Sequence, residues 1–437
     1  MKAKDLKDRI VVTGLGINVP IGDTLDSYFD SLMAGKSALC RWKFTDTSGI
    51  YSKVGGDLSD YDHDAKLAAL RGVLPDDMHK RMRKILKRAP WSTKLSMLCA
   101  SDAWINAGLS HEGSHAIDPT RMAVIVGGHN LNKNYEHVNY LQFTKEPDYI
   151  DSQASLSALD TDHAGSVGEV LGALGPAYTV GGACASANVG LRSGADEILH
   201  HDCDVAVVVG AVFDYAPMDL HAMALMGAIS FQSFNDEPTK ASRPYDTRRE
   251  GFVPSHGAGV VIIERLSHAL ARGATIHAEL MGVATMSDGS HLPSPSVDGQ
   301  SRTMLRLMDN AGIKPEQIDY VSAHATSTPL GDLTELNSIK KTFGAHAKKL
   351  KLNAPKSMLG HTCWSAPTVE TVAAILQMQR GWLHPSINID SLDPEVDLDV
   401  CANERTQHEI TYMLKNSFGF GGINCCALYK KFDSGSV

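Results

Sequence analysis

The 437-residue chain lacks the paired cysteines that bind a metal or build the disulfide framework of a small secreted domain. Its eight cysteines include no Cys-x-x-Cys pair, so we expect no metal, no disulfides and a reducing compartment. No run approaches the roughly 18 apolar residues of a membrane span, and residues 1–16 lack the apolar stretch and cleavage site of a signal peptide. We therefore predict a cytoplasmic protein with no membrane segment.

The chain also lacks the excess of positive charge that is typical of nucleic-acid-binding domains. Its formal net charge is −9, which disfavours a nucleic-acid partner. Residues 79–88 are a local exception, because cations crowd a short helical pattern there. This run is either the solvated face of an amphipathic helix or a docking patch for an acidic partner. The candidate docking residues are Arg81, Arg83, Lys84 and Lys87.

Apolar residues make up 43% of the chain and charged residues 21%, enough for two halves that each bury a core. Strand-like and helical runs alternate, which predicts α/β architecture with buried sheets. A seam near 267–275 divides the chain into halves, 1–266 and 267–437, with a similar order of elements. The strand-like runs are 9–16, 122–128, 205–212, 258–266, 276–285, 318–326, 414–422 and 424–432, and the helical runs are 91–107, 188–200, 300–312, 331–343 and 367–380.

Cys184 lies in TVGGACASANVGL, where a strand pattern breaks at two glycines and becomes a helix pattern. A thiol at a helix N-terminus is next to the positive end of the helix dipole, which favours a nucleophilic thiolate. The alternative is a buried free cysteine, which packs as a small apolar residue. Two later segments, HATSTPLGDLTE and KSMLGH, each supply a histidine that could serve a thiolate, His324 and His361.

Several ordered motifs together resemble one family, the β-ketoacyl-acyl carrier protein synthases of the elongating type. The resemblance extends from about residue 9 to residue 432 and suits a stand-alone ketosynthase of a polyketide pathway. It implies a thiolase-like fold of two similar halves in five αβαβα layers, a homodimer, and acyl carrier protein as partner. The motifs, in order, are RIVVTGLGINVPIG, GGACAS, SRPYDTRREGFV, HATSTPLGD, KSMLGH and NSFGFGGIN.

The resemblance also implies a Cys–His–His site. Cys184 accepts an acyl group as a thioester, which divides the reaction into easier steps. His324 and His361 donate hydrogen bonds to the enolate that remains when a malonyl group loses carbon dioxide. The backbone N–H groups of Cys184 and Phe420 hold the second oxyanion, and Lys356 is an electrostatic element beside the second histidine. Phe420 acts as a gate over the acyl pocket or as a packing residue.

Four further residues are expected to support the site. Asp332 and Glu335 fall three apart at a predicted helix start, so capping of that helix competes with a catalytic role. Thr326 and Thr328 belong to the same motif as the first histidine. The glycines of the first motif resemble a dinucleotide turn, but no acidic residue follows at the required place. We therefore predict no cofactor.

Two departures from the family pattern affect the expected site. His256 occupies a position where a carboxylate is usual, so we expect it to lie beside Lys356, to have its pKa lowered by like-charge repulsion, and to leave that lysine without its usual partner. Trp364 stands in place of a glycine and could shorten or reshape the pocket. Such changes indicate a specialised member of the family.

We therefore predict a synthase that forms a carbon–carbon bond by decarboxylative Claisen condensation. Within the same class, the alternative is a malonyl-acyl carrier protein decarboxylase of a polyketide β-branching cassette, which typically carries serine at the nucleophile position. From another class, the alternative is a non-catalytic partner that sets chain length, and such partners usually lose the nucleophile. The basic run 79–88 is the only feature that favours a structural or nucleic-acid-binding protein.

Overall fold

The computed structural model describes residues 8–114 and 116–436. Part of the segment in which we predicted no signal peptide, residues 1–7, therefore lies outside the described residues. Within the described ranges, no helix has the length and apolarity needed to cross a bilayer. The helices are α1 (Leu25–Met33), α2 (His63–Ala69), α3 (Asp76–Leu86), α4 (Trp91–Ala107), α5 (Lys133–Lys145), α6 (Ala154–Ser157), α7 (Thr161–Leu171), α8 (Ser186–His200), α9 (Pro217–Leu225), α10 (Leu266–Ala271), α11 (Val297–Ala311), α12 (Pro329–Phe343), α13 (Lys356–Leu359) and α14 (Ala366–Arg380).

Ten strands form one mixed sheet in the order β10-β9-β13-β14-β8-β1-β7-β6-β4-β5. Two small sheets, β2–β3 and β11–β12, lie apart from it. The strands are β1 (Ile10–Asn18), β2 (Leu39–Arg41), β3 (Val54–Gly56), β4 (Met122–Gly127), β5 (Ala177–Val180), β6 (Val205–Gly210), β7 (Ala258–Arg265), β8 (Ala278–Ser287), β9 (Tyr320–Ser322), β10 (Lys351–Asn353), β11 (Trp382–Leu383), β12 (Thr406–Gln407), β13 (Tyr412–Gly419) and β14 (Ile423–Lys430).

The sheet consists of two halves with the same topology. In the first half the spatial order is β1-β7-β6-β4-β5, and in the second it is β8-β14-β13-β9-β10. In each half, the strand that comes first in the chain lies at the centre of the sheet. The last strand of that half lies next to it, followed by the second-to-last strand. The second and third strands of that half form the outer part of the sheet. The halves meet where β1 pairs with β8 through Ile10–Val12 and Ala278–Leu280.

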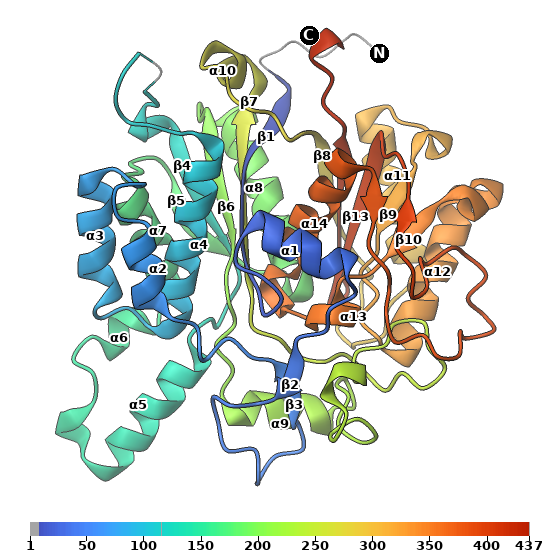
Figure 1. Ribbon diagram of the computed structural model, residues 1–437, viewed down its shortest axis with the longest axis horizontal. Coiled ribbons are helices and arrows are strands. Elements are labelled where there is room, and N and C mark those ends of the chain that lie inside the picture. Colours follow the sequence, from blue (N-terminus) through green and yellow to red (C-terminus); the bar gives the residue numbers. More distant parts are fainter. Residues whose placement is uncertain (1–7, 115, 437) are drawn as a thin grey trace.

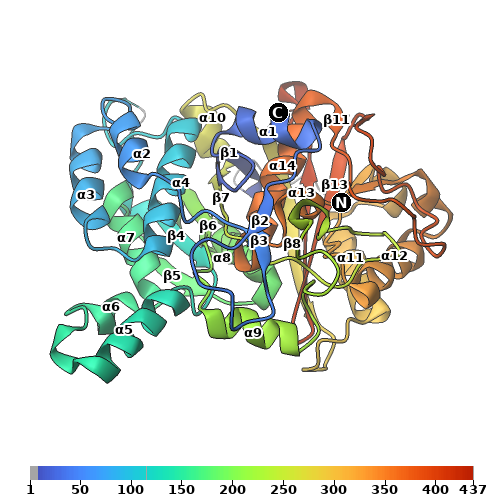
Figure 2. The ribbon, with the colours of Figure 1, turned by 60° about the horizontal axis from the view of Figure 1, so that its bottom comes forward.

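Five layers result, as the family resemblance implied. The helices α8 and α14 contact strands of both halves and lie between them (Figure 1). On the outer faces, α4 and α7 cover the first half, whereas α11 and α12 cover the second (Figure 2). The thiolase-like arrangement of two similar halves is thus confirmed. The boundary at 266/267 stays a prediction, because both halves share one sheet and one central helical layer.

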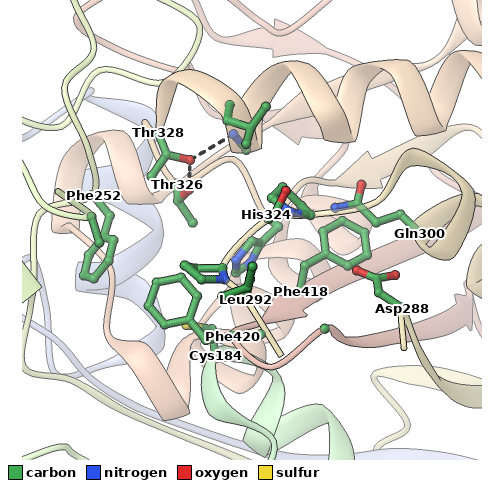
Figure 3. A pocket seen from close by; sticks show the side chains of 18 of the residues that line it. Cys184, Phe252, Asp288, Leu292, Gln300, His324, Thr326, Thr328, Phe418 and Phe420 are labelled. Carbon is green, nitrogen blue, oxygen red and sulfur yellow. Dashed lines mark hydrogen bonds between the residues drawn. The ribbon is translucent and has the colours of Figure 1, made fainter. Parts of the chain in front are cut away.

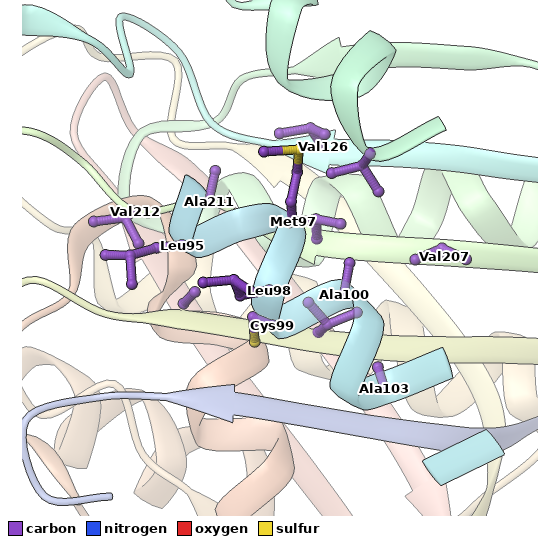
Figure 4. Packing of buried hydrophobic residues seen from close by; sticks show 14 of the residues in the cluster. Leu95, Met97, Leu98, Cys99, Ala100, Ala103, Val126, Val207, Ala211 and Val212 are labelled. Atoms are coloured by element: carbon purple, nitrogen blue, oxygen red, sulfur yellow. The ribbon is translucent and has the colours of Figure 1, made fainter. Parts of the chain in front are cut away.

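The core of the first half forms because one helix and its neighbouring strands are apolar on the faces that meet. β6 reads VAVVVG and is buried throughout, as expected for a strand that is covered on both faces. Helix α4 follows Pro90 and ends at Gly108 with a φ of 61°, a left-handed conformation that glycine adopts easily. Leu95 and Met97 of α4 pack among the buried side chains of the sheet (Figure 4).

Candidate active site

Cys184 lies at the carboxyl edge of the first half of the sheet. β5 ends at Val180, and Gly181 and Gly182 lead into the short 3₁₀ helix η4 (Ala183–Ala185), which α8 follows directly. The predicted strand-to-helix transition is therefore confirmed. The Gly182 N–H donates to Ser186 Oγ at 2.9 Å, which closes the turn. Cys184 is buried, but its side chain lines a cavity.

The cavity, about 280 Å³ in volume, brings the predicted nucleophile together with both predicted histidines. His324 lies in the loop between β9 and α12, and His361 follows α13. Their rings meet edge to face with centroids 5.5 Å apart. Figure 3 shows Cys184, His324 and Phe420 around this space. Cys184 thus shares one site with two histidines that lie 140 or more positions after it in the sequence.

Both histidines are held neutral. Burial lowers the pKa of His324 and of His361 well below 6.5, and the positive charges of Lys356 and Lys415 lower both further. The backbone N–H of Cys363 donates to His361 Nδ1 at 3.2 Å, so the ring proton resides on Nε2. No hydrogen-bond partner for this Nε2 occurs among the described residues. The neutral ring can therefore donate a hydrogen bond to a substrate.

The prediction of a thiolate at Cys184 is wrong for this arrangement. Burial raises the pKa of the Cys184 thiol to about 11, while the Lys356 charge and the backbone N–H groups of Phe420 and Cys184 oppose that rise. A 3₁₀ turn separates the sulfur from the first residue of α8. Loss of water around the sulfur outweighs the Lys356 charge and the two backbone N–H groups, because desolvation penalises the charged form.

Lys356 has a carboxylate partner, contrary to our expectation. Its Nζ contacts Glu370 Oε1 and donates to the backbone oxygen of His324 at 2.6 Å. The second oxygen of Glu370 lies 2.6 Å from Lys415 Nζ. All three side chains are buried, so Glu370 is shared by two ammonium groups. Burial lowers the pKa of Lys415, while Glu370 and the buried Glu335 act in the opposite direction. Both lysines lie close enough to His324 and His361 to lower the pKa values of the two imidazoles.

Sequence reasoning missed Glu370 and Lys415. Glu370 falls in the apolar run APTVETVAAIL of α14, and Lys415 falls in YMLKNSF of β13. A charged residue inside a buried apolar run was the available signal, since such residues are rarely buried unless they are paired.

His256 lies elsewhere than predicted. Its ring is surrounded by the rings of Trp42, Trp91 and Tyr215, and its Nδ1 lies 3.8 Å from Asp57 Oδ1. Burial lowers its pKa to about 4, and Asp57 acts in the opposite direction. The lowered pKa was predicted, but its cause is desolvation rather than repulsion by a lysine.

Glu335 and Asp332 hold the loop that carries the first histidine. Glu335 accepts hydrogen bonds from the N–H groups of His324 and Ala325, at 2.9 and 2.8 Å. Asp332 accepts from the N–H of Ser327 at 3.0 Å. The loop needs this support, because Ala325 and Ser327 have φ values of 27° and 70°, which are strained for residues other than glycine. We infer that both carboxylates position His324.

The predicted helix cap is a threonine rather than one of the carboxylates. Thr328 Oγ1 accepts from the N–H of Gly331 at 3.2 Å and caps α12. It also lies 3.0 Å from Thr326 Oγ1, and both threonines line the cavity (Figure 3). Capping by Asp332 or Glu335 is therefore not found.

Phe420 lies in the tight turn between β13 and β14, and its side chain is 40% exposed. It lines the cavity, and its backbone N–H faces the sulfur of Cys184. A gate role for the ring stays a prediction.

The candidate docking residues do not reach the cavity. They lie on and just after α3, which packs against α7 on the outside of the first half (Figure 1). Met82 faces inward, whereas Arg83, Lys84 and Lys87 are exposed. Arg81 is partly buried and pairs with Asp77 at 2.6 Å.

No group of three or more histidine, cysteine or acidic side chains is arranged to hold a metal ion in the described part of the chain. The lining of the cavity is instead apolar with a few convergent polar groups, which is typical of a site for an organic ligand.

Comparison with known proteins points to one family. Residues 7–269 match the family model of the β-ketoacyl synthase N-terminal domain, and residues 277–390 match that of the C-terminal domain. A 3-oxoacyl-[acyl-carrier-protein] synthase 2 of Coxiella burnetii is 33% identical, over 96% of this chain and 97% of its own length. The polyketide biosynthesis malonyl-ACP decarboxylase PksF of Bacillus subtilis is 31% identical, over 95% of this chain and 94% of its own.

Solved structures of similar proteins agree with the sequence comparison. The ishigamide ketosynthase/chain length factor superposes with a TM-score of 0.85 at 26% identity, covering 97% of this chain and 99% of that one. A type II polyketide ketosynthase, solved in complex with its acyl-carrier protein, superposes with a TM-score of 0.83 at 27% identity over the same shares.

Proposed function

This chain belongs to the β-ketoacyl synthase family, and from that premise we propose that it condenses an acyl group with a malonyl-derived unit on acyl carrier protein. The observation that carries the proposal is the meeting of Cys184, His324 and His361 at one cavity. A thiol and two neutral N–H donors are the groups that a decarboxylative Claisen condensation needs.

The first step is transfer of the acyl group to Cys184. The sulfur of Cys184 attacks the acyl thioester, the bond from the carbonyl carbon to the carrier sulfur breaks, and the cysteine proton ends on the carrier thiol. The N–H groups of Cys184 and Phe420, which face the sulfur, would receive the oxyanion that forms on the carbonyl oxygen. Each such donor is worth about 3–4 kcal/mol in the transition state.

The second step is decarboxylation. A malonyl thioester replaces the spent carrier, with its carbonyl oxygen between His324 and His361. The bond to the carboxylate breaks, carbon dioxide leaves, and the electron pair becomes the enolate that both N–H groups stabilise. The positive charge of Lys356, which lowers the pKa values of both histidines, favours this anion. The enolate carbon then attacks the Cys184 thioester, and the cysteine sulfur leaves as a thiolate that takes up a proton from solvent and becomes the thiol again.

Intact-protein mass spectrometry tests this sequence directly. The protein is mixed with an acyl carrier protein loaded with acetyl and then with its malonyl form. We expect an acetyl adduct on the protein, followed by a 3-oxobutanoyl product on the carrier and loss of one carbon dioxide. Carbon dioxide release without the longer product would contradict condensation.

The second candidate function is decarboxylation of malonyl carrier protein without condensation. Two observations favour it: the name of the Bacillus subtilis relative and the packing of Trp364 with His129 and Phe213 next to the segment that carries Cys184. The presence of Cys184 favours condensation, because decarboxylation alone needs no nucleophile.

We propose acyl carrier protein as the partner, since one structural relative was solved in complex with such a protein. The exposed cations of α3 would attract an acidic carrier, and charge attraction of this kind acts on encounter rate and weakens with salt. Replacing Arg83, Lys84 and Lys87 together by glutamate should raise the apparent KM for carrier-bound substrates by about tenfold or more. Small thioester substrates should be affected little.

A matched control reverses three exposed cations of the second half, Arg306, Lys314 and Lys349. This variant has the same change in net charge, so it should leave the KM for carrier substrates near the parental value at 150 mM salt. If both variants raise the KM for carrier substrates equally, α3 is a solvated helix face and not a docking surface. The same conclusion holds if the α3 variant raises the KM for carrier-bound and small thioester substrates equally.

We propose that the chain works as a homodimer. β5 is the outermost strand of the first half, so one of its edges lacks a strand partner within the described residues. The nearby α5 buries no side chain and exposes Val138, Tyr140 and Phe143. An open sheet edge next to an exposed apolar face suits a second copy of the same surface, related by a two-fold axis.

Light scattering after gel filtration tests the dimer. The parent protein should have the mass of two chains. The double variant Tyr140→Asp and Phe143→Asp should have the mass of one chain at micromolar concentration. Val73→Asp, at an exposed residue between α2 and α3, should leave the dimer intact. A parent protein that elutes as a monomer would contradict the proposal.

A further inference from the structure

Trp364 lies beside the nucleophile although it does not line the cavity. It is the middle residue of the 3₁₀ helix η8 (Cys363–Ser365), which packs against the 3₁₀ helix η4 that carries Cys184. Only 9% of Trp364 is exposed, and it belongs to the same apolar cluster as Cys184. The segment that carries the indole therefore lies directly against the segment that carries the sulfur.

Two further aromatic rings complete a wall with Trp364. The His129 ring stacks on the indole with centroids 4.4 Å apart and an angle of 29° between the planes. The Phe213 ring lies on another side, 5.1 Å away. His129 follows β4 and Phe213 follows β6, and both strands are parallel to β5, which leads to Cys184. All three segments thus end at the same edge of the sheet.

The wall also reaches the turn that precedes the nucleophile. A Cβ atom placed on Gly181 would lie 3.1 Å from His129 Cδ2, so the imidazole packs directly on this backbone. Interiors are packed at nearly crystalline density, and side chains yield little to an added chain of methylene groups. A long acyl chain bound to Cys184 cannot extend in this direction.

The cavity beside Cys184 is lined by other segments than those that carry the three rings. Its lining comes from the end of α9, the β8–α11 loop, the start of α12 and the β13–β14 turn, and none of the three wall residues contributes to it. This opening is the route by which a carrier thioester approaches Cys184 and the two histidines. An acyl chain folded back into it would compete with the malonyl thioester for the same space.

We infer that Trp364, supported by His129 and Phe213, limits the acyl group on Cys184 to about the size of acetyl. The inference deepens the proposed function and rests on it, because it names the substrate class of that site. Trp364 is a specificity-determining residue: it excludes medium and long chains by occupying the volume that their methylene groups would need.

The test is acylation of Cys184 by acetyl, hexanoyl and decanoyl thioesters of N-acetylcysteamine, followed by intact-protein mass spectrometry. In the parent we expect acetyl to load at least about tenfold faster than hexanoyl, with decanoyl undetectable. Trp364→Ala should load hexanoyl and decanoyl at least about tenfold faster than the parent while acetyl changes little. Trp364→Leu creates a smaller cavity and should gain hexanoyl only.

Trp382→Ala is the matched control, because Trp382 is partly exposed on β11, where Arg405 lies over its ring. This variant should keep the parental preference. Thermal melting and carbon dioxide release from malonyl carrier protein show for each variant whether the fold and the two histidines are intact. A selectivity change in Trp364→Leu remains decisive if Trp364→Ala does not fold.

The outcomes separate this inference from the proposed function. A parent that loads decanoyl as fast as acetyl overturns the inference and leaves condensation standing. If the parent loads no acyl group but a Trp364 variant does, condensation by the parent is overturned. The same result supports the role of Trp364 in limiting the acyl group on Cys184. If both folded Trp364 variants load acetyl without gaining longer chains, the wall does not determine specificity.

Discussion

Cys184→Ala is expected to abolish formation of the acyl-enzyme while carbon dioxide release from malonyl carrier protein persists. The sulfur is the acyl acceptor in the proposed first step, whereas decarboxylation depends on His324 and His361. The measurement is the mass of the protein after mixing with acetyl carrier protein, with carbon dioxide followed in parallel. Loading should fall below detection, because no other cysteine lines the cavity among the described residues.

Cys40→Ala is the matched control, because Cys40 is more exposed than Cys184 but lies outside the cavity. This variant should load acetyl at the parental level. Iodoacetamide should modify Cys184 in the parent only slowly at pH 7, since burial raises the pKa of that thiol and the thiolate is the reactive form. Undiminished acyl loading in Cys184→Ala would contradict its assignment as nucleophile.

His324→Ala and His361→Ala are each expected to slow decarboxylation by about a hundredfold or more. Removal of one preorganised donor to an oxyanion costs about 10²–10³ in rate. Transfer of acetyl to Cys184 should be retained in part, because the backbone donors at Cys184 and Phe420 remain. The measurement is the rate at which malonyl carrier protein loses carbon dioxide, with acyl loading of the same variant followed by mass.

The pH dependence follows from the lowered pKa values. A histidine whose pKa lies well below 6.5 stays neutral as the pH falls from 8 through 6.5, so the decarboxylation rate should remain flat over that range. It should decline only at lower pH, when protonation of His324 or His361 changes the charge of the site. A rate that halves near pH 6.5 in the parent would contradict the pKa shift that burial, Lys356 and Lys415 impose.

His408→Ala removes a histidine outside the cavity and controls for loss of an imidazole in general. It should decarboxylate at the parental rate. His361→Asn keeps an N–H donor at nearly the same place and should recover part of the loss seen in His361→Ala. Parental decarboxylation by either alanine variant would show that the histidine concerned has been assigned wrongly.

Local patterns determined much of the fold. The alternation of buried strand runs with helical runs predicted the α/β class, and eight of the ten strands of the sheet overlap a predicted run, whereas β5 and β10 were not predicted. The run 318–326 was overestimated, because β9 comprises only Tyr320–Ser322. Strain in the following loop and the contacts of Glu335 with the backbone end the strand before His324. Strand pairing between the halves and the repeated topology involve residues far apart in the chain, so no local pattern could reveal them.

The sequence by itself determined the candidate residues Cys184, His324 and His361, because each lies in a motif whose residue types carry a particular chemistry. Only the tertiary structure decided their electrostatics and surroundings. It pairs both Lys356 and Lys415 with Glu370, surrounds His256 with aromatic rings, and stacks Trp364 on His129. The reason is physical: burial and charge pairing depend on which distant segments meet in space, and desolvation can outweigh a local feature such as a helix N-terminus.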